Sequence, residues 1–368
     1  MTETLTAAAR RHGVFHRLRV SAVERLTDDS VTITFAVPAE LSDDYAFAAG
    51  QHLTVRATID GTEVRRNYSI CAPATSGRLR VAVKRLDGGV FSGFATGSLA
   101  VGDEMDVMTP TGRFVPRLEP GQAKHYCAIA AGSGITPVLS IVATVLAVEP
   151  RSSVTLIYGN RTTRSVMFLD ELADLKDRYP TRFQLVNVLS REQQEVELFH
   201  GRIDGAKLAQ LMDTLVPSAR VDEWFLCGPF AMVEQARDTL LAAGVQPGQV
   251  HLELFHVEGE APRDAGAGTT AERDEGSSSV TITLDGRSTT FDVPRGGTRV
   301  LDAALAVRGD APYACKGGVC GTCRAKLVSG QVAMDRNYAL EPDELAGGFV
   351  LACQSVPLTD EVVLDFDQ

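Results

Sequence analysis

Four cysteines near the C-terminal end of the chain constrain its fold most strongly. Cys315, Cys320 and Cys323 form a C-x4-C-x2-C run, and Cys353 follows about thirty residues later, which is the ligand spacing of a 2Fe–2S cluster. Two irons bridged by two sulfides need four thiolates, and three of them can come from one loop. Glycines inside the run suit such a loop, because a backbone without Cβ turns tightly and brings amides close to sulfur. The run predicts that these four cysteines are iron ligands.

Two other interpretations of the cysteines compete with the cluster. Structural zinc usually takes paired C-x2-4-C knuckles rather than a run of three with a distant fourth. Disulfides belong to oxidising compartments, and nothing in the sequence suggests a secreted chain. The remaining cysteines, Cys71, Cys127 and Cys227, are scattered and odd in number, which does not favour a disulfide framework. A colourless, iron-free preparation would favour zinc.

Length and charge limit the classes of protein to consider. A chain of 368 residues is long enough for two or three domains, each with its own core. The formal net charge of −11 argues against a nucleic-acid surface. The N-terminus lacks the continuous apolar core of a signal peptide, and the longest apolar stretch, residues 135–148, is too short to span a bilayer. We expect a cytoplasmic protein that binds neither nucleic acid nor membranes.

Residues 12–118 have the pattern of a β-domain. Apolar residues alternate with polar or small ones in several short runs, around residues 31–35, 53–59 and 79–83. Turn signals such as Asp60-Gly61 and Asp87-Gly88-Gly89 separate the runs. Short strands with a single apolar face predict a closed or nearly closed antiparallel barrel, in which we expect His52 and Cys71 to be packing residues.

Residues 119–257 change to a pattern of alternating strands and helices. This alternation predicts a parallel sheet covered on both faces. The expected strands are residues 126–130, 154–158, 183–189, 224–227 and 251–255, and the expected helices are residues 137–148, 165–176, 206–215 and 231–243.

Residues 258–279 interrupt the pattern and predict a flexible linker. They are rich in Gly, Ala, Ser, Thr, Glu and Arg, with no aliphatic side chain larger than alanine. Alternation resumes with Val280, Ile282 and Leu284, and residues 300–307 predict a short helix before the cysteine loop. Residues 280–368 should therefore form a small separate domain, which the linker would allow to move.

Two short motifs in the barrel could bind a ligand that carries a phosphate and a flat heterocycle. Arg66-Asn67-Tyr68-Ser69 places a cation, an aromatic ring and a hydroxyl together, as a phosphate and a flat heterocycle would require. Gly89-Val90-Phe91-Ser92 is a glycine turn whose amides and Ser92 hydroxyl could bind an anion. Taken singly, neither motif requires a ligand. The first is compatible with a surface arginine and a barrel tyrosine, and the second with an ordinary hairpin.

Three motifs in the second domain point to a dinucleotide. The segment from Gly132 to Pro137 joins a strand to a helix and would present free amides to a pyrophosphate, although Pro137 replaces the third glycine of G-x-G-x-x-G. Arg161 and Arg164 stand where an acidic residue would bind a ribose 2′-hydroxyl, so they favour a 2′-phosphate and NADPH over NADH. Cys227-Gly228-Pro229 ends a strand at the carboxyl edge, where α/β sheets bind ligands. Tight turns and a solvated basic loop without a ligand are the alternatives.

Together, these motifs resemble the ferredoxin–NADP reductase superfamily, and the cysteine run resembles plant-type ferredoxins. The order of the domains is similar to that of the reductase components of bacterial multicomponent oxygenases. More narrowly, the chain resembles the reductase subunits of phenylacetyl-CoA epoxidase complexes. This narrower resemblance rests on five segments: Phe15-His16-x-Leu18, Ala49-Gly50-Gln51-His52-Leu53, Leu156-Ile157-Tyr158-Gly159-Asn160-Arg161-Thr162, His200-Gly201-Arg202-Ile203-Asp204-Gly205 and His251-Leu252-Glu253.

The resemblance implies an FAD-binding antiparallel β-barrel, an NADPH-binding α/β domain and a C-terminal β-grasp, ferredoxin-like α+β domain. It implies catalytic roles for Ser69 and Cys227, which would lie by flavin N5 and by the nicotinamide, and for Glu253, near the flavin. The implied FAD contacts are Arg66 to the pyrophosphate, Tyr68 on the flavin ring, Gly89 and Ser92 at the phosphates, and Phe255 near the ring. The implied NADPH contacts are Gly132, Gly134, Thr136, Pro137, Arg161, Arg164, Cys227, Gly228 and Pro229. FAD rather than FMN follows from the resemblance alone.

The resemblance further implies an electron path from NADPH to FAD, to the 2Fe–2S cluster, and on to the subunits of a di-iron oxygenase. The epoxidase that acts on phenylacetyl-CoA in aerobic phenylacetate degradation is the expected partner. The reductase of another aromatic, steroid or alkane oxygenase is the alternative within this class. A non-catalytic electron carrier or redox sensor is the alternative from another class, and rapid NADPH-dependent reduction of an artificial acceptor would exclude it.

Overall fold

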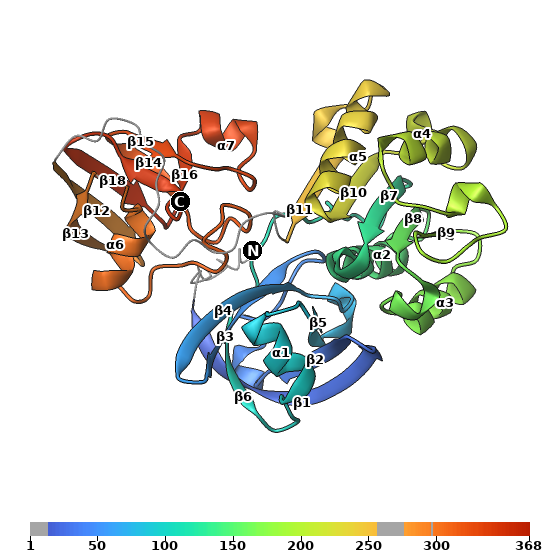
Figure 1. Ribbon diagram of the computed structural model, residues 1–368, viewed down its shortest axis with the longest axis horizontal. Helices are drawn as coiled ribbons and strands as arrows, with labels where there is room; N and C mark the ends of the chain where they lie inside the picture. The colour runs from blue at the N-terminus through green and yellow to red at the C-terminus, as the bar shows by residue number, and fades with distance from the viewer. Residues whose placement is uncertain (1–13, 256–275, 296) are drawn as a thin grey trace, which may run out of the picture. The chain divides into compact units, whose positions relative to one another are not determined.

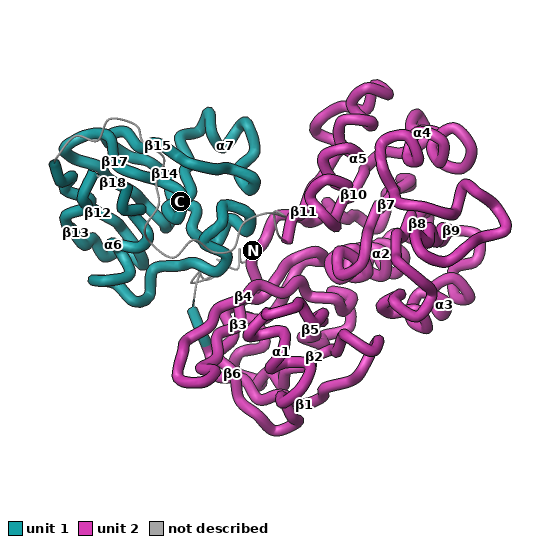
Figure 2. Tube along the Cα trace, in the orientation of Figure 1, with its two compact units in different colours: residues 1–15, 259–368 teal, residues 16–258 magenta. Residues whose placement is uncertain are grey.

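The computed structural model describes residues 14–255, 276–295 and 297–368, which fall into two compact units. One unit spans residues 16–258 and the other contains residues 259–368, as the two colours of Figure 2 show. The predicted linker spans residues 258–279, and its residues 258–275 lie outside the described residues. Near its C-terminal end strand β12 begins at Ser277, so Ser277–Ser279 belong to the C-terminal unit.

The first part of the larger unit is the predicted antiparallel β-domain (Figure 1). Its sheet has the order β4-β3-β6-β1-β2-β5, and a bridge between Ile70 and Val81 brings the two edge strands together. Inward-facing residues such as Leu53 and Val55 form one apolar core, as the alternating pattern predicts. The elements are β1 (Phe15–Thr27), β2 (Ser30–Ala36), β3 (His52–Ile59), β4 (Thr62–Ser69), β5 (Leu79–Lys84), α1 (Val90–Gly97) and β6 (Glu104–Met108).

The second part is the predicted parallel sheet, with strand order β11-β10-β7-β8-β9. Helices cover both faces: α2 and α3 pack with one set of strand residues, and α4 and α5 with the alternate set. The elements are β7 (His125–Ala131), α2 (Ile135–Val148), β8 (Ser153–Asn160), α3 (Leu169–Arg178), β9 (Phe183–Leu189), α4 (Gly205–Thr214), β10 (Glu223–Gly228), α5 (Phe230–Ala242) and β11 (Val250–Leu254).

Helix α2 joins the barrel to the sheet. Twelve of its fourteen residues are buried, because the sheet covers one side and the barrel another (Figure 1). Its polar side chains find partners in the barrel backbone: Ser140 Oγ donates to the Ala72 carbonyl at 2.7 Å, and the Ala74 amide donates to Thr144 Oγ1 at 3.0 Å. Buried hydroxyls that are paired in this way fix the contact between the two parts.

Helix α3 begins four residues later than predicted. The sequence favoured a helix from residue 165, but Phe168 has a φ of +60° and α3 starts at Leu169. A left-handed conformation is unfavourable for phenylalanine and ends any helix that would precede it. Tertiary contacts hold it: the Phe168 ring is buried, and the Arg80 guanidinium of the barrel lies 5.6 Å from its centroid.

The C-terminal unit has the predicted β-grasp α+β arrangement. A mixed sheet of order β13-β12-β18-β14-β16 contains an antiparallel hairpin (β12, β13) and a parallel pair (β12, β18), and helix α6 contributes to its core. The elements are β12 (Ser277–Leu284), β13 (Arg287–Pro294), α6 (Val300–Val307), β14 (Arg324–Ser329), β15 (Val332–Met334), α7 (Pro342–Ala346), β16 (Phe349–Leu351), β17 (Ser355–Pro357) and β18 (Glu361–Asp365). Among the helices of the described residues, none has the length and apolar character needed to cross a membrane.

Replacing Arg80 should loosen the contact between barrel and sheet. Its guanidinium donates to both Glu171 oxygens, at 2.9 and 2.7 Å, and its side chain is 7% exposed against 40% for Glu171. Because Glu171 is partly solvated, we expect Arg80→Ala to lower the free energy of unfolding by about 2 kcal/mol rather than the larger value of a fully buried pair. Fluorescence of the single, fully buried Trp224 during urea unfolding would measure this.

Arg17→Ala is the matched control. Arg17 pairs with Glu104 at 2.8 Å, but both side chains are more than half exposed. An exposed pair of this kind should change the stability by no more than about 0.5 kcal/mol. Equal effects of the two substitutions would show that the Arg80 pair does not stabilise the contact.

Candidate functional site

The two barrel motifs come together in the fold. Tyr68, near the end of β4, packs against Phe91 of α1 with ring centroids 5.3 Å apart. Arg66 is exposed, two residues before Tyr68 on β4, and its Nη1 donates to the neighbouring Arg65 carbonyl. A flat aromatic side chain beside a solvent-facing cation fits the flavin ring and phosphates that the sequence predicts, so Tyr68 and Arg66 remain candidate FAD contacts.

Gly89 and Ser92 shape the turn that begins helix α1. Gly89 caps the helix, and a Cβ at this position would lie 2.4 Å from Ser92 Oγ. The Ser92 hydroxyl accepts from the Leu86 amide at 3.0 Å and donates to the Gly89 carbonyl at 3.2 Å. The Ser92 hydroxyl therefore stabilises the turn. The backbone amides of the turn are then the main candidate donors to the flavin phosphates.

The nucleotide turn and the Cys227 motif lie directly against each other. A Cβ on Gly134 would lie 2.2 Å from the Cys227 carbonyl oxygen, so only glycine allows this approach. Gly132 has a φ of +54°, and a Cβ there would meet no atom within 4 Å, which leaves the outer side of the turn open to a pyrophosphate. The other residues predicted to contact NADPH lie next to this turn. Thr136 donates to the Ser133 carbonyl, and Pro137 lies in the first turn of α2. Gly228 ends β10, and Pro229 caps α5.

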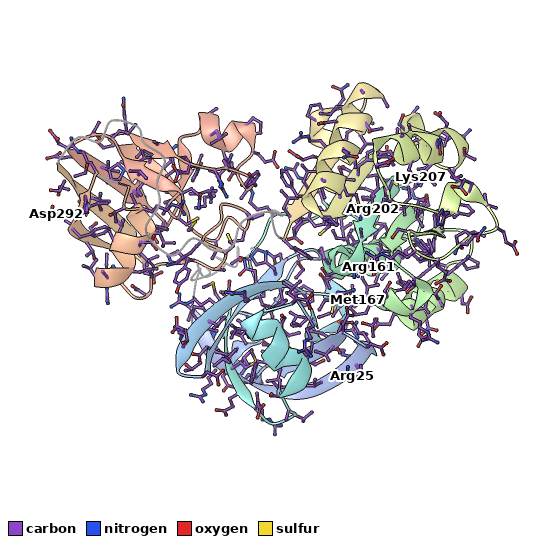
Figure 3. All side chains as sticks on the ribbon, viewed as in Figure 1. Arg25, Arg161, Met167, Arg202, Lys207 and Asp292 are labelled. Atoms are coloured by element: carbon purple, nitrogen blue, oxygen red, sulfur yellow. The ribbon has the colours of Figure 1, made fainter. Side chains whose placement is uncertain are left out.

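Arg161 and Arg164 lie on the segment that joins β8 to α3, and both are exposed. Figure 3 labels Arg161 and Met167 on this segment. Glu192 holds the segment in place, since its carboxylate accepts from the Thr163 amide at 2.8 Å and from the Thr163 hydroxyl at 2.7 Å. The Arg191 amide donates to the Arg161 carbonyl, so a third arginine adjoins the two that the sequence analysis singled out.

The junction between barrel and sheet contains a largely buried carboxyl group, that of Glu253 on β11. Ser69 Oγ, at the end of β4, donates to Glu253 Oε2 at 2.9 Å. Burial raises the pKa of Glu253 to about 8, although the hydrogen bond from Ser69 opposes this. The Glu253 side chain is 14% exposed, and its other oxygen, Oε1, lies 4.0 Å from Nδ1 of His52. The sequence analysis treated His52 only as a packing residue and missed this contact.

Cys227 lies beside Glu253, because the two residues are paired in the β10–β11 ladder. Burial, with repulsion from Glu253 added, raises the pKa of Cys227, so its side chain is a neutral thiol at neutral pH. Phe255 follows the end of β11 and is 40% exposed. Three predicted residues, Ser69, Cys227 and Glu253, are therefore brought together, while the predicted flavin contact of Phe255 stays a prediction.

The four predicted iron ligands converge in the C-terminal unit. The Cys320 and Cys353 side chains lie beside the Cys315 sulfur and lower the pKa of Cys315. The Gly317 amide donates to Cys315 Sγ at 3.3 Å. The Cys353 side chain also lies beside Cys323, which completes the group of four.

The cysteine loop is built to wrap around its sulfur atoms. Lys316, Gly318 and Gly321 all have positive φ, which curls the backbone and turns amides inward. Cys323 and Cys353 are buried, whereas Cys315 is exposed. The side chains of the described residues do not form a recognisable single-ion site. Four soft thiols from one curled loop and one distant strand end are the donor set that a 2Fe–2S cluster requires.

A flavin motif, a nucleotide turn and a four-thiol loop define an NAD(P)H-dependent flavin oxidoreductase with an iron–sulfur domain. Comparisons with known families agree. Residues 17–115 match the oxidoreductase FAD-binding domain, residues 128–238 the oxidoreductase NAD-binding domain, and residues 282–358 the 2Fe-2S iron-sulfur cluster binding domain.

The chain belongs to a family of 1,2-phenylacetyl-CoA epoxidase subunits. It is 48% identical to the member of this family from Escherichia coli (strain K12) over 354 residues, which cover 96% of this chain and 98% of the relative. It is 34% identical to the ferredoxin reductase component of 3-ketosteroid-9-alpha-monooxygenase from Rhodococcus rhodochrous, over 95% of this chain and 96% of that one. The solved structure of phthalate dioxygenase reductase covers 96% of the chain with a TM-score of 0.56 and 27% identity, and 98% of that structure is matched.

Removing one thiol should abolish the iron site. Cys323 is buried beside Cys353, so Cys323→Ala should lose most of the iron and acid-labile sulfide, together with the visible absorbance of the cluster. Cys127→Ala is the matched control, because Cys127 is equally buried but lies in the parallel sheet. Full iron content in the Cys323 variant, or loss of iron in the Cys127 variant, would contradict the assignment.

Proposed function

We propose that this protein is the reductase of a phenylacetyl-CoA epoxidase complex, carrying electrons from NADPH through FAD and a 2Fe–2S cluster to a di-iron oxygenase. One observation carries the proposal: the 48% identity to the Escherichia coli relative spans almost the whole of both chains. The barrel, the parallel sheet and the thiol loop therefore match one relative along nearly its whole length, rather than three separate proteins.

FAD, when bound, accepts a hydride and releases electrons singly, which the one-electron cluster requires. The residues of this chain supply orientation and electrostatics. Tyr68 and Arg66 would hold the flavin ring and its phosphates. Ser69 and Glu253 would provide a hydroxyl and a carboxyl group near the flavin. Cys227 remains an uncharged thiol, so it would add no negative charge beside the nicotinamide.

NADPH rather than NADH is the donor that the loop after β8 favours. Arg161 and Arg164 are exposed, Arg191 adjoins Arg161, and Glu192 fixes the backbone between the first two through Thr163. Several guanidinium groups at one exposed turn suit a dianionic 2′-phosphate better than a pair of ribose hydroxyls.

The exposed side of the thiol loop is the proposed exit for electrons toward the oxygenase. Cys315 is exposed and Cys320 partly so, whereas Cys323 and Cys353 are buried. A partner that docks over residues 315–320 would come closest to the cluster. Cytoplasmic location is part of the proposal, supported by the free thiols of Cys71, Cys127 and Cys227, which suit a reducing compartment.

A steroid oxygenase is the second candidate partner. Ferredoxin reductase components of 3-ketosteroid-9-alpha-monooxygenases are 34–36% identical to this chain over 95% of its length. The lower identity places this candidate behind the epoxidase, and direct assay distinguishes the two.

The proposal predicts substrate-triggered NADPH oxidation. The FAD- and cluster-loaded protein would be mixed with NADPH and the oxygenase subunits of a phenylacetyl-CoA epoxidase, and phenylacetyl-CoA added last. We expect NADPH consumption to rise at that point, with epoxide formed in proportion. Cys323→Ala should give no coupled product, because electrons cannot leave the flavin through the cluster.

Other outcomes of this assay separate the levels of the proposal. Reduction of flavin and cluster by NADPH, with no response to phenylacetyl-CoA, would leave a reductase whose partner is another oxygenase. The same assay with a 3-ketosteroid monooxygenase would then test the second candidate. Failure of NADPH to reduce the flavin would contradict the reductase function itself.

The arginines should set the preference for NADPH. In the double variant Arg161→Ala/Arg164→Ala we expect kcat/KM for NADPH to fall by about a hundredfold or more, since each charge-assisted contact with a phosphate contributes roughly 1.5–3 kcal/mol. The value for NADH should change little. Arg178→Ala, exposed at the far end of α3, is the control and should leave both values unchanged. Equal losses for both nucleotides would contradict 2′-phosphate recognition.

A further inference from the structure

Gln354 directly follows the fourth predicted iron ligand, Cys353, and is 1% exposed. It lies between β16 and β17, and its backbone is held on both sides. Its amide donates to the Leu351 carbonyl at 2.8 Å, and its carbonyl accepts from the Asp335 amide at 3.0 Å. Glutamine is seldom buried, because its side-chain amide must find hydrogen-bond partners away from water. A glutamine at this position therefore requires a reason beyond filling space.

The side-chain amide of Gln354 faces the cysteine loop. Its Nε2 donates to the Lys316 carbonyl at 2.8 Å and to the Cys353 carbonyl at 2.9 Å, and it also donates to Cys353 Sγ at 3.5 Å. Carbonyl oxygens only accept hydrogen bonds, so the group that faces them is the NH2 group and not the amide oxygen. The side chain therefore presents N–H to the sulfur of a predicted ligand.

The same amide connects the two parts of the ligand set. Lys316 lies inside the loop of three cysteines and has a φ of +50°, whereas Cys353 follows β16. The loop backbone also packs against the stem of Gln354, since a Cβ on Gly318 would lie 3.1 Å from Gln354 Cγ. One side chain thus ties the loop to a ligand that is distant in the sequence.

The two ends of the Gln354 amide differ in their partners. Its Oε1 is buried and has no hydrogen-bond partner among the residues that the structure describes. An unpaired buried acceptor is unfavourable, and a methionine or leucine would fill the same space without one. This destabilisation is accounted for if the NH2 group, at the other end, stabilises negative charge on the sulfur.

The charge on the cysteine sulfurs depends on the oxidation state of the cluster that they hold. Reduction adds one negative charge, and hydrogen bonds to the sulfurs stabilise the more negative state, which raises the reduction potential. A buried donor has a larger effect than one in water, because the protein interior screens charge weakly. The Gly317 amide donates to the exposed ligand, Cys315, and the Gln354 side chain donates to the buried ligand, Cys353.

We propose that Gln354 is a positioning residue of the iron–sulfur site that raises its reduction potential. Its NH2 group stabilises the added negative charge on Cys353 Sγ, and its hydrogen bond to the Lys316 carbonyl holds the loop against that ligand. Gln354 acts through Cys353 and supplies no iron ligand itself. The inference rests on the 2Fe–2S site, but on neither the electron donor nor the oxygenase partner of the proposed function.

The first test measures the reduction potential. Gln354→Met keeps the length of the side chain and removes both N–H groups. In the FAD- and cluster-loaded variant, the equilibrium constant for one-electron reduction of the cluster should fall by about tenfold, or about 59 mV, the low end for a hydrogen bond to a charged group. A mediated titration with dithionite, followed by the EPR signal of the reduced cluster, needs neither NADPH nor a partner. The flavin midpoint in the same sample should stay unchanged.

Gln331→Met is the matched control, because Gln331 is an exposed glutamine just before β15 in the same unit. It should leave both midpoints unchanged. An unshifted cluster midpoint in Gln354→Met with full iron content would overturn the proposal, and so would an equal shift in Gln331→Met. If Gln354→Met loses its iron, the midpoint is measured in Gln354→Asn, whose shorter amide cannot span from Lys316 to Cys353 and should lower the potential in the same way.

The second test needs no substitution. The protein would be made by cell-free synthesis with glutamine labelled with ¹⁵N in its side chain, then loaded, reduced and studied by pulsed EPR. We expect a ¹⁵N coupling to the unpaired electron of the reduced cluster, because Nε2 lies 3.5 Å from a ligand sulfur. The coupling should persist in Gln331→Met and vanish in Gln354→Met.

Absence of this coupling in the original protein would overturn the proposal, even if every substitution of Gln354 released the iron. Failure of NADPH to reduce the flavin, in a separate assay, would contradict the reductase function. Both results on Gln354 would stand in that case, because dithionite supplies the electrons in each.

Discussion

Helix α2 is apolar on nearly every side, and the architecture of the larger unit depends on covering it. A helix that packs on one face of a sheet usually exposes its outer side to solvent, but twelve of the fourteen residues of α2 are buried. The barrel supplies the second cover and accepts the hydrogen bond from Ser140. Separation of the two parts would expose this apolar surface and leave buried hydroxyls unpaired, so barrel and sheet form one unit.

The covering of α2 also determines where the predicted site residues of the larger unit lie. Strand β4 ends at Ser69 and β10 ends at Gly228, and both ends reach the junction that α2 creates. Gly134, at the start of α2, lies so close to Cys227 that a Cβ cannot be accommodated. The glycine-rich turn is therefore required by packing as well as by a nucleotide phosphate. One contact thus determines the relative positions of the glycine turn, Cys227 and, through the β10–β11 pairing, Glu253.

Local patterns predicted most of the fold, because strands and helices with one apolar face show their period in the sequence. Strand β9 and helix α6 have the predicted bounds, and the four thiols converge as their spacing indicated. Helix α3 was placed too early because the left-handed Phe168 is held by Arg80 from another domain. His52 was missed for the same reason: its partner, Glu253, comes from the last strand of the unit, and no short motif records that contact.

Contact with a partner and binding of the nucleotides make different demands on a protein, and this chain meets them in different units. Electron transfer to a partner needs the thiol loop of the C-terminal unit and an exposed edge near Cys315. The nucleotide motifs instead need close packing inside the larger unit, where Ser69, Glu253 and Cys227 lie side by side. The surface of the C-terminal unit can therefore differ for another oxygenase while the packing of the larger unit stays unchanged. Relatives named for phenylacetyl-CoA and for 3-ketosteroid oxygenases, matching this chain over nearly its whole length, fit such a division.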